Sequence, residues 1–69
     1  MQITFYDFLI TYYLSENSPL GDLAHDVQLD GNFPTESKSE DEIRDYFSNI
    51  GTPGFQEALD EALNYFRRL

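Results

Sequence analysis

The sequence has 69 residues, with 13 Asp and Glu against 4 Lys and Arg, a formal net charge of −9 and no cysteine. A single domain over residues 1–69 is expected, and at this size its core is too thin to leave much room for a deep, water-excluding active site. The missing cysteine excludes disulfides, thiol catalysis, iron–sulfur clusters and cysteine zinc sites, while the acid excess makes nucleic-acid backbones and anionic membranes poor partners.

The first predicted helix runs from about Thr4 to Ser15. Thr4 is placed to cap it, and Asp7 suits its first turn. The spacing i, i+3, i+4, i+7, i+8 defines one apolar face, made of Phe5, Phe8, Leu9, Tyr12 and Tyr13. A second apolar stripe beside it holds Tyr6, Ile10 and Leu14. A helix that is apolar around most of its circumference lies centrally in the fold or is partly covered by a partner.

The second predicted helix begins with Ser18 as the N-cap and Pro19 in the first turn. Its narrow apolar face consists of Leu20, Leu23, Ala24 and Val27. We expect Gly31 to end this helix in a left-handed conformation. Phe33 and Pro34 then form an extended pair, with the Phe33 ring tucked under the loop.

Two further helices follow a polar linker over residues 35–39. Ser39 and Glu42 have the spacing of a capping box, and Gly51 is expected to end the third helix. Thr52 and Pro53 begin the fourth helix. The apolar residues of the third helix are Ile43, Tyr46, Phe47 and Ile50; those of the fourth are Phe55, Leu59, Ala62, Leu63 and Phe66, with Ala58 and Tyr65 at the edges. No strand pattern competes, so the sequence predicts an all-α, compact four-helix domain.

Residues that could carry chemistry are few. The only histidine, His25, lies beside Asp26 on the second helix but opposite no evident nucleophile, so no catalytic residues are expected and the protein is predicted not to be an enzyme. Asp22, Asp26 and Asp30 recur every four residues, and the spacing does not decide whether this acidic face is simply solvated or binds a cation. The segment from Asp26 to Gly31 lacks the remaining ligands of a calcium loop, so neither a metal site nor a cofactor is predicted.

Taken in order, the residues resemble the YozE-like family of small bacterial proteins with a SAM-like (sterile alpha motif-like) fold. The matching positions are Phe5, Tyr6, Leu9, Ala24, Asp30, Phe33, Pro34, Ser37, Glu42, Ile43, Tyr46, Asp60, Glu61, Ala62 and Phe66. Leu63 stands where the family often has tryptophan, and Phe66 where it has tyrosine. The resemblance implies four helices in a SAM-like arrangement. It brings no catalytic residues, and SAM-like domains serve protein contacts, self-association and nucleic-acid binding alike.

The functional hypothesis is a non-enzymatic, cytoplasmic module for protein–protein interaction, with an unidentified protein partner. Two candidate surfaces are the stripe of Tyr6, Ile10 and Leu14, and the acidic segment that includes Glu40, Asp41 and Asp45. The overall acidity is typical of a soluble protein held apart from others by repulsion, and it also fits an acidic surface for a basic partner or a nucleic-acid mimic.

The alternative is a nucleic-acid-associated protein, which requires Arg44, Arg67 and Arg68 to converge. The sequence leaves two alternatives for the oligomeric state. The protein associates weakly with itself, with the acidic third helix of one copy facing Arg67 and Arg68 of another, or it is a monomer in which these arginines cap their own helix. The N-terminal residues lack a basic region, so no secretory signal is expected, and no apolar run is long enough for a membrane span.

Overall fold

Four helices make up the computed structural model, which describes residues 3–49 and 52–69. The helices are α1 (Phe5–Tyr13), α2 (Pro19–Leu29), α3 (Glu40–Tyr46) and α4 (Pro53–Arg67). No strand occurs in the described ranges, which confirms the predicted all-α class with four helices. The predicted ends Ile50 and Gly51 lie outside the described residues.

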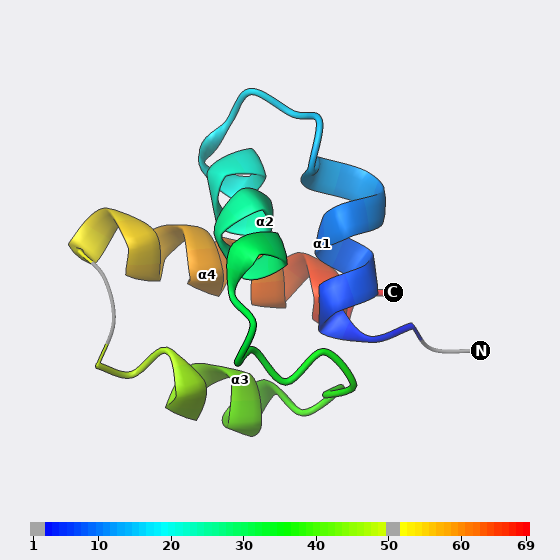
Figure 1. Cartoon of the computed structure of the whole chain (residues 1–69), viewed down its shortest axis with the longest axis vertical. Helices are drawn as coiled ribbons and strands as arrows, with labels where there is room; N and C mark the ends of the chain where they lie inside the picture. Colours follow the sequence, from blue (N-terminus) through cyan, green and yellow to red (C-terminus); the bar gives the residue numbers. More distant parts are fainter. Residues whose placement is uncertain (1–2, 50–51) are drawn as a thin grey trace.

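The helices are arranged around α4, the longest of them. α1 and α2 run side by side, joined by the short connection at the top of Figure 1, and both pack against α4, which passes behind α2. α3 lies below this group, between the loop that follows α2 and the start of α4. The resulting body measures 33 × 26 × 24 Å.

All four predicted N-caps are confirmed. In each case the side-chain oxygen of the cap accepts a hydrogen bond from the backbone N–H three residues later, which satisfies one of the unpaired donors at the helix start. The pairs are Thr4–Asp7 at 3.1 Å, Ser18–Gly21 at 3.2 Å, Ser39–Glu42 at 3.3 Å and Thr52–Phe55 at 3.3 Å. The backbone N–H of Ser39 donates to Ser37 Oγ at 3.2 Å, a bond that a full capping box assigns to the Glu42 side chain.

Two helix ends and the conformation of one predicted cap differ from the prediction. α1 stops at Tyr13 rather than Ser15. α2 ends at Leu29, where the prediction placed its end, but Gly31 is not left-handed; instead Asp30 Oδ1 accepts the Asn32 N–H at 2.9 Å, so an Asx turn ends the helix. α3 stops at Tyr46, where the Ser48 hydroxyl donates to the Asp45 carbonyl at 2.8 Å and so competes with a further helical turn.

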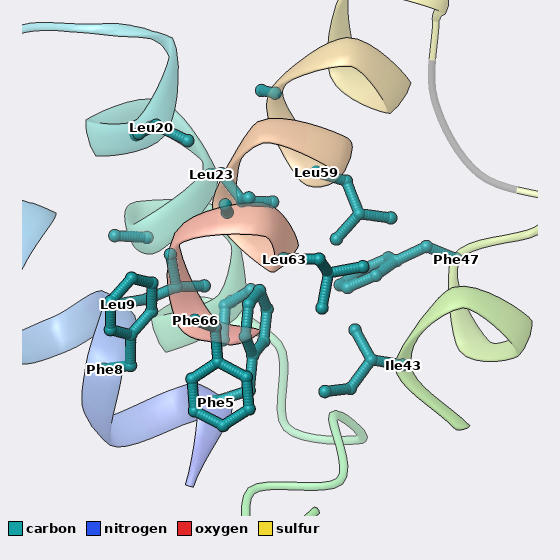
Figure 2. Close-up of a cluster of buried hydrophobic side chains, with 14 of the residues drawn as sticks. Phe5, Phe8, Leu9, Leu20, Leu23, Ile43, Phe47, Leu59, Leu63 and Phe66 are labelled. Carbon is teal, nitrogen blue, oxygen red and sulfur yellow. The ribbon is translucent and has the colours of Figure 1, made fainter. Parts of the chain in front are cut away.

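The core draws side chains from every helix. Figure 2 shows Ile43 of α3 and Phe47, the C-cap of that helix, reaching toward Leu63 of α4, with Phe5 and Phe66 beside them. The buried set is Phe5, Phe8, Leu9, Leu20, Leu23, Ala24, Val27, Phe33, Ile43, Phe47, Ala58, Leu59, Ala62, Leu63 and Phe66. Each fully buried large side chain contributes about 1.5–3 kcal/mol relative to an exposed one, so the core is the main source of stability.

Tyr12, which shares the predicted apolar face of the first helix with Phe5, Phe8 and Leu9, is not part of the core, because 57% of this residue is exposed. α2 and α4 cover the side of α1 that carries Phe5, Phe8 and Leu9, and this covered arc is narrower than the apolar arc of the sequence. Tyr12 instead lies at the edge, with its ring centroid 5.6 Å from that of Phe8. On α4, the sequence placed Phe55 on the inward face and Ala58 at its edge. In the structure Ala58 is buried and Phe55 is half-buried.

Candidate functional site

A groove of about 480 Å³ lies between the first halves of α2 and α4. Its lining residues are Pro19, Asp22, Leu23 and Asp26 from α2, and Thr52, Gly54, Phe55, Glu57, Ala58 and Glu61 from the start of α4. Leu23 and Ala58 are buried, while the acidic lining residues are exposed, so the groove has an apolar floor and a polar rim.

Helical periodicity explains why the rim is acidic on both sides. Asp22 and Asp26 are four residues apart, as are Glu57 and Glu61, and residues at this spacing lie on one face of a helix, about 6 Å apart along its axis. In each helix the first carboxylate directly precedes a buried floor residue, Leu23 in α2 and Ala58 in α4. When these floor residues pack together, the acidic pairs are brought to the same groove.

The groove carries negative charge that its own lining does not balance. Among the described residues that line it, none is a lysine, arginine or histidine. Two of the four basic residues are used elsewhere: Arg44 pairs with Glu40 and Asp60, and Arg67 pairs with Glu40. Like charges at i,i+4 are mildly unfavourable, and four carboxylates around one groove produce a local negative potential.

The acidic face of α2 does not gather into a metal site. Within residues 3–49 and 52–69, no three His, Cys, Asp or Glu side chains are arranged to hold a metal ion. Asp30 turns to other partners, because its Oδ2 accepts a hydrogen bond from the Tyr46 hydroxyl at 2.5 Å. This bond lowers the pKa of Asp30 and raises that of Tyr46, since it favours the ionised carboxylate and the neutral phenol.

His25 is exposed on α2 and does not line the groove, although Asp22 and Asp26 on either side of it do. Asp26 is turned about 100° from His25 around the helix, while Asp22, three residues earlier, lies on a neighbouring part of the helix surface. Among the described residues, the groove therefore gathers carboxylates without a histidine.

The first predicted surface, the stripe of Tyr6, Ile10 and Leu14, is half-buried at all three positions. Tyr6 and Leu14 pack against the hydrophobic core, and the Tyr6 ring centroid lies 6.3 Å from that of Phe33. Part of this stripe is thus used by the fold itself.

The second predicted surface, the acidic segment of α3, divides into two kinds of residue. Asp41 and Asp45 are exposed, whereas Glu40 is the centre of an ion-pair cluster. Glu40 Oε1 lies 2.6 Å from Arg67 Nη2, and Glu40 Oε2 lies 2.9 Å from Arg44 Nε. Hydrogen bonds from Arg67 and then Arg44 hold the pKa of Glu40 below its usual range.

Two of the arginines required by the nucleic-acid alternative do converge, because Arg44 and Arg67 both reach Glu40. Their guanidinium groups are occupied by carboxylates, including Asp60 at 2.6 Å from Arg44, so the convergence does not make a basic patch. The same contacts bear on head-to-tail pairing: Arg67 meets the acidic α3 within one chain, in addition to lying in the last turn of its own helix.

Sequence reasoning missed Glu57 and Glu61 as partners of Asp22 and Asp26. The available signal was the shared pattern of a carboxylate followed by a buried apolar residue, with a second carboxylate one turn later.

None of the helices in the described ranges is both long and apolar enough to cross a membrane.

A family model described as YozE SAM-like fold matches residues 4–68, nearly the whole chain. Neither a search of curated proteins nor a search of solved structures finds a match.

Proposed function

The chain belongs to the YozE SAM-like family, and we propose that it is a small, non-enzymatic, cytoplasmic interaction module that binds a segment of a partner protein in the groove between α2 and α4. The observation that carries this proposal is an apolar floor, Leu23 and Ala58, framed by exposed polar side chains at the surface of the molecule. Apolar surface at the centre with a polar rim is the usual anatomy of a protein-binding site.

The proposal favours the groove over the two surfaces named from the sequence. The stripe of Tyr6, Ile10 and Leu14 is half covered by the fold, and Glu40 is held by Arg44 and Arg67. The groove, by contrast, combines a concave shape with lining residues from two helices. It is open and small, which suits a short segment of polypeptide rather than a reaction that needs water excluded.

Peptide selection tests this proposal without knowledge of the partner. A random peptide library would be panned against the wild-type protein and against Gly54→Trp, which adds bulk to the groove lining without changing charge. Gly31→Trp is the matched control, because Gly31 is exposed outside the groove and a Cβ atom there would meet nothing within 4 Å.

We expect selected peptides to bind wild type and Gly31→Trp but to lose binding to Gly54→Trp. Peptides that bind all three proteins equally, or a library that yields no peptide sensitive to Gly54→Trp, would overturn the groove as the interaction site. Unchanged circular dichroism and Tm of both tryptophan variants would show that the comparison is not affected by unfolding.

A further inference from the structure

We infer that the segment bound in the groove is basic, with at least two arginine or lysine side chains that pair with the two acidic edges and one apolar side chain that covers the floor between them. This inference rests on the proposed function and names the chemistry of its partner. It follows from the shape of the groove, its charge and its apolar floor taken together.

The first step is the placement of charge on both walls. Asp22 and Asp26 line one side, and Glu57 and Glu61 line the other, each pair spaced by about 6 Å along its helix. A peptide bound between these walls therefore has carboxylates on both sides, from α2 and from α4. Cationic side chains therefore find partners on both edges, whereas acidic side chains are repelled from both.

The second step is that the described part of the chain offers little compensation of its own. Arg44 and Arg67 are engaged in the Glu40 cluster, and no basic residue lines the groove. A second copy of this chain is the poorer occupant, because each copy carries a net charge of −9. A foreign basic segment relieves the repulsion between the carboxylates instead of adding to it.

The third step is the apolar surface beneath the charges. The stems of arginine and lysine lie along apolar surface while their charged ends reach carboxylates. Phe55 lines the groove, is half-buried, and is fixed by an edge contact with Phe47 at 5.2 Å between ring centroids. Its ring adds aromatic surface on which a guanidinium group can stack.

Three labelled peptides of equal length test the inference by fluorescence anisotropy. The first has the order Arg, Ala, Leu, Arg between Gly-Ser ends; the second replaces both arginines by citrulline, which keeps the shape and removes the charge; the third replaces them by glutamate. We expect the arginine peptide to bind, with an affinity that falls as salt is raised, and the other two to bind at least about tenfold more weakly.

Matched double variants locate the charge effect. Asp26→Asn with Glu61→Gln removes one carboxylate from each wall, and Glu36→Gln with Asp41→Asn removes two exposed carboxylates outside the groove. We expect about tenfold weaker binding of the arginine peptide to the first pair and little change for the second. Equal weakening of both would show attraction to net charge alone and would overturn the inference.

The outcomes also separate this inference from the proposed function. If the citrulline or glutamate peptide binds as well as the arginine peptide, and Gly54→Trp abolishes that binding, the groove remains a binding site and its basic partner is wrong. If the arginine peptide binds Gly54→Trp as well as wild type, the inference is overturned, and a library without any Gly54→Trp-sensitive peptide removes the proposed function as well.

Discussion

Arg67 Nη2 lies 2.6 Å from Glu40 Oε1, so an ion pair joins the last turn of α4 to the first turn of α3 across 27 positions of sequence. Arg44, one turn further along α3, contacts the same Glu40 and also Asp60 of α4. A helix of seven residues cannot stabilise itself in water, so α3 depends on such contacts and on the buried side chains of Ile43 and of its C-cap, Phe47.

Removal of the Glu40 charge is therefore expected to loosen α3. Glu40→Gln should lower the Tm and increase amide hydrogen exchange in α3, because two arginines lose their shared partner. Asp41→Asn is the matched control, since Asp41 is exposed in the same first turn and changes the charge equally. Equal effects of the two substitutions would mean that the ion pairs contribute nothing measurable.

The contribution of Glu40 should depend on pH in a defined direction. Its pKa is lowered in the folded protein, from a usual value of 4.5, by the hydrogen bonds from Arg67 and Arg44. The stabilisation is then fully present above the unfolded value and is lost as the pH falls through the lower, folded value. Urea unfolding at several pH values should show wild type and Glu40→Gln differing near neutral pH and converging in acid; a constant difference would contradict this.

The Tyr46–Asp30 hydrogen bond should be visible in the titration of the phenol. It raises the pKa of Tyr46 above 10.0 and lowers that of Asp30 below 3.8. Its stabilisation is therefore complete between these two values, is lost as the pH falls through the folded pKa of Asp30, and is lost as the pH rises through that of Tyr46.

An ultraviolet titration of wild type against Tyr46→Phe isolates the Tyr46 transition. In Asp30→Asn, this transition should move down toward 10.0, because the carboxylate that disfavours the phenolate is gone. A Tyr46 transition unchanged by Asp30→Asn would show that the hydrogen bond does not persist in solution.

Leu63 tests the core. It is fully buried, and Leu63→Ala should cost about 2–5 kcal/mol. At about 0.05–0.15 kcal/mol per residue, a chain of this length has a total stability of about 3–10 kcal/mol, so the variant should be close to unfolding at 37 °C. Leu29→Ala is the control, because Leu29 is 82% exposed, and its effect on urea unfolding should be within about 0.5 kcal/mol.

Gly21 tests a close approach of backbone. A Cβ atom at this position would lie 1.8 Å from the carbonyl oxygen of Glu16 and 3.1 Å from that of Tyr13, so the α1–α2 connection would have to move. Gly21→Ala should therefore destabilise by about 1–3 kcal/mol or more, although alanine is the better helix former. Gly54→Ala, in the first turn of α4, meets only the Thr52 hydroxyl at 3.7 Å and should not destabilise the protein; the reverse order would be inconsistent with this packing.

The parts of the fold that depend on neighbouring residues were predictable from the sequence. Thr4, Ser18, Ser39 and Thr52 cap the helices as expected, because a cap hydrogen bond spans only three residues. The prediction of a left-handed Gly31 was wrong for an equally local reason. The side chain of Asp30 accepts a hydrogen bond from the backbone two residues later and so forms an alternative turn.

Features that depend on which helix faces meet were not predictable in this way. Tyr12 has the spacing of a core residue, but α2 and α4 cover a narrower arc of α1 than its apolar residues span. Likewise, Asp26 of α2 and Glu61 of α4 line the same groove only because the two helices pack together. Periodicity gives the face of each helix, and the partner of that face comes from tertiary packing.

The binding surface itself can be mapped most directly by two-dimensional ¹H–¹⁵N NMR of the labelled protein during titration with the arginine peptide. We expect the shifted amides to lie in residues 22–26 of α2 and 54–61 of α4, with those of Tyr6, Ile10 and Leu14 and of Asp41 and Asp45 unchanged. Shifts confined to either of those other surfaces, or no shifts at low salt, would contradict binding in the groove.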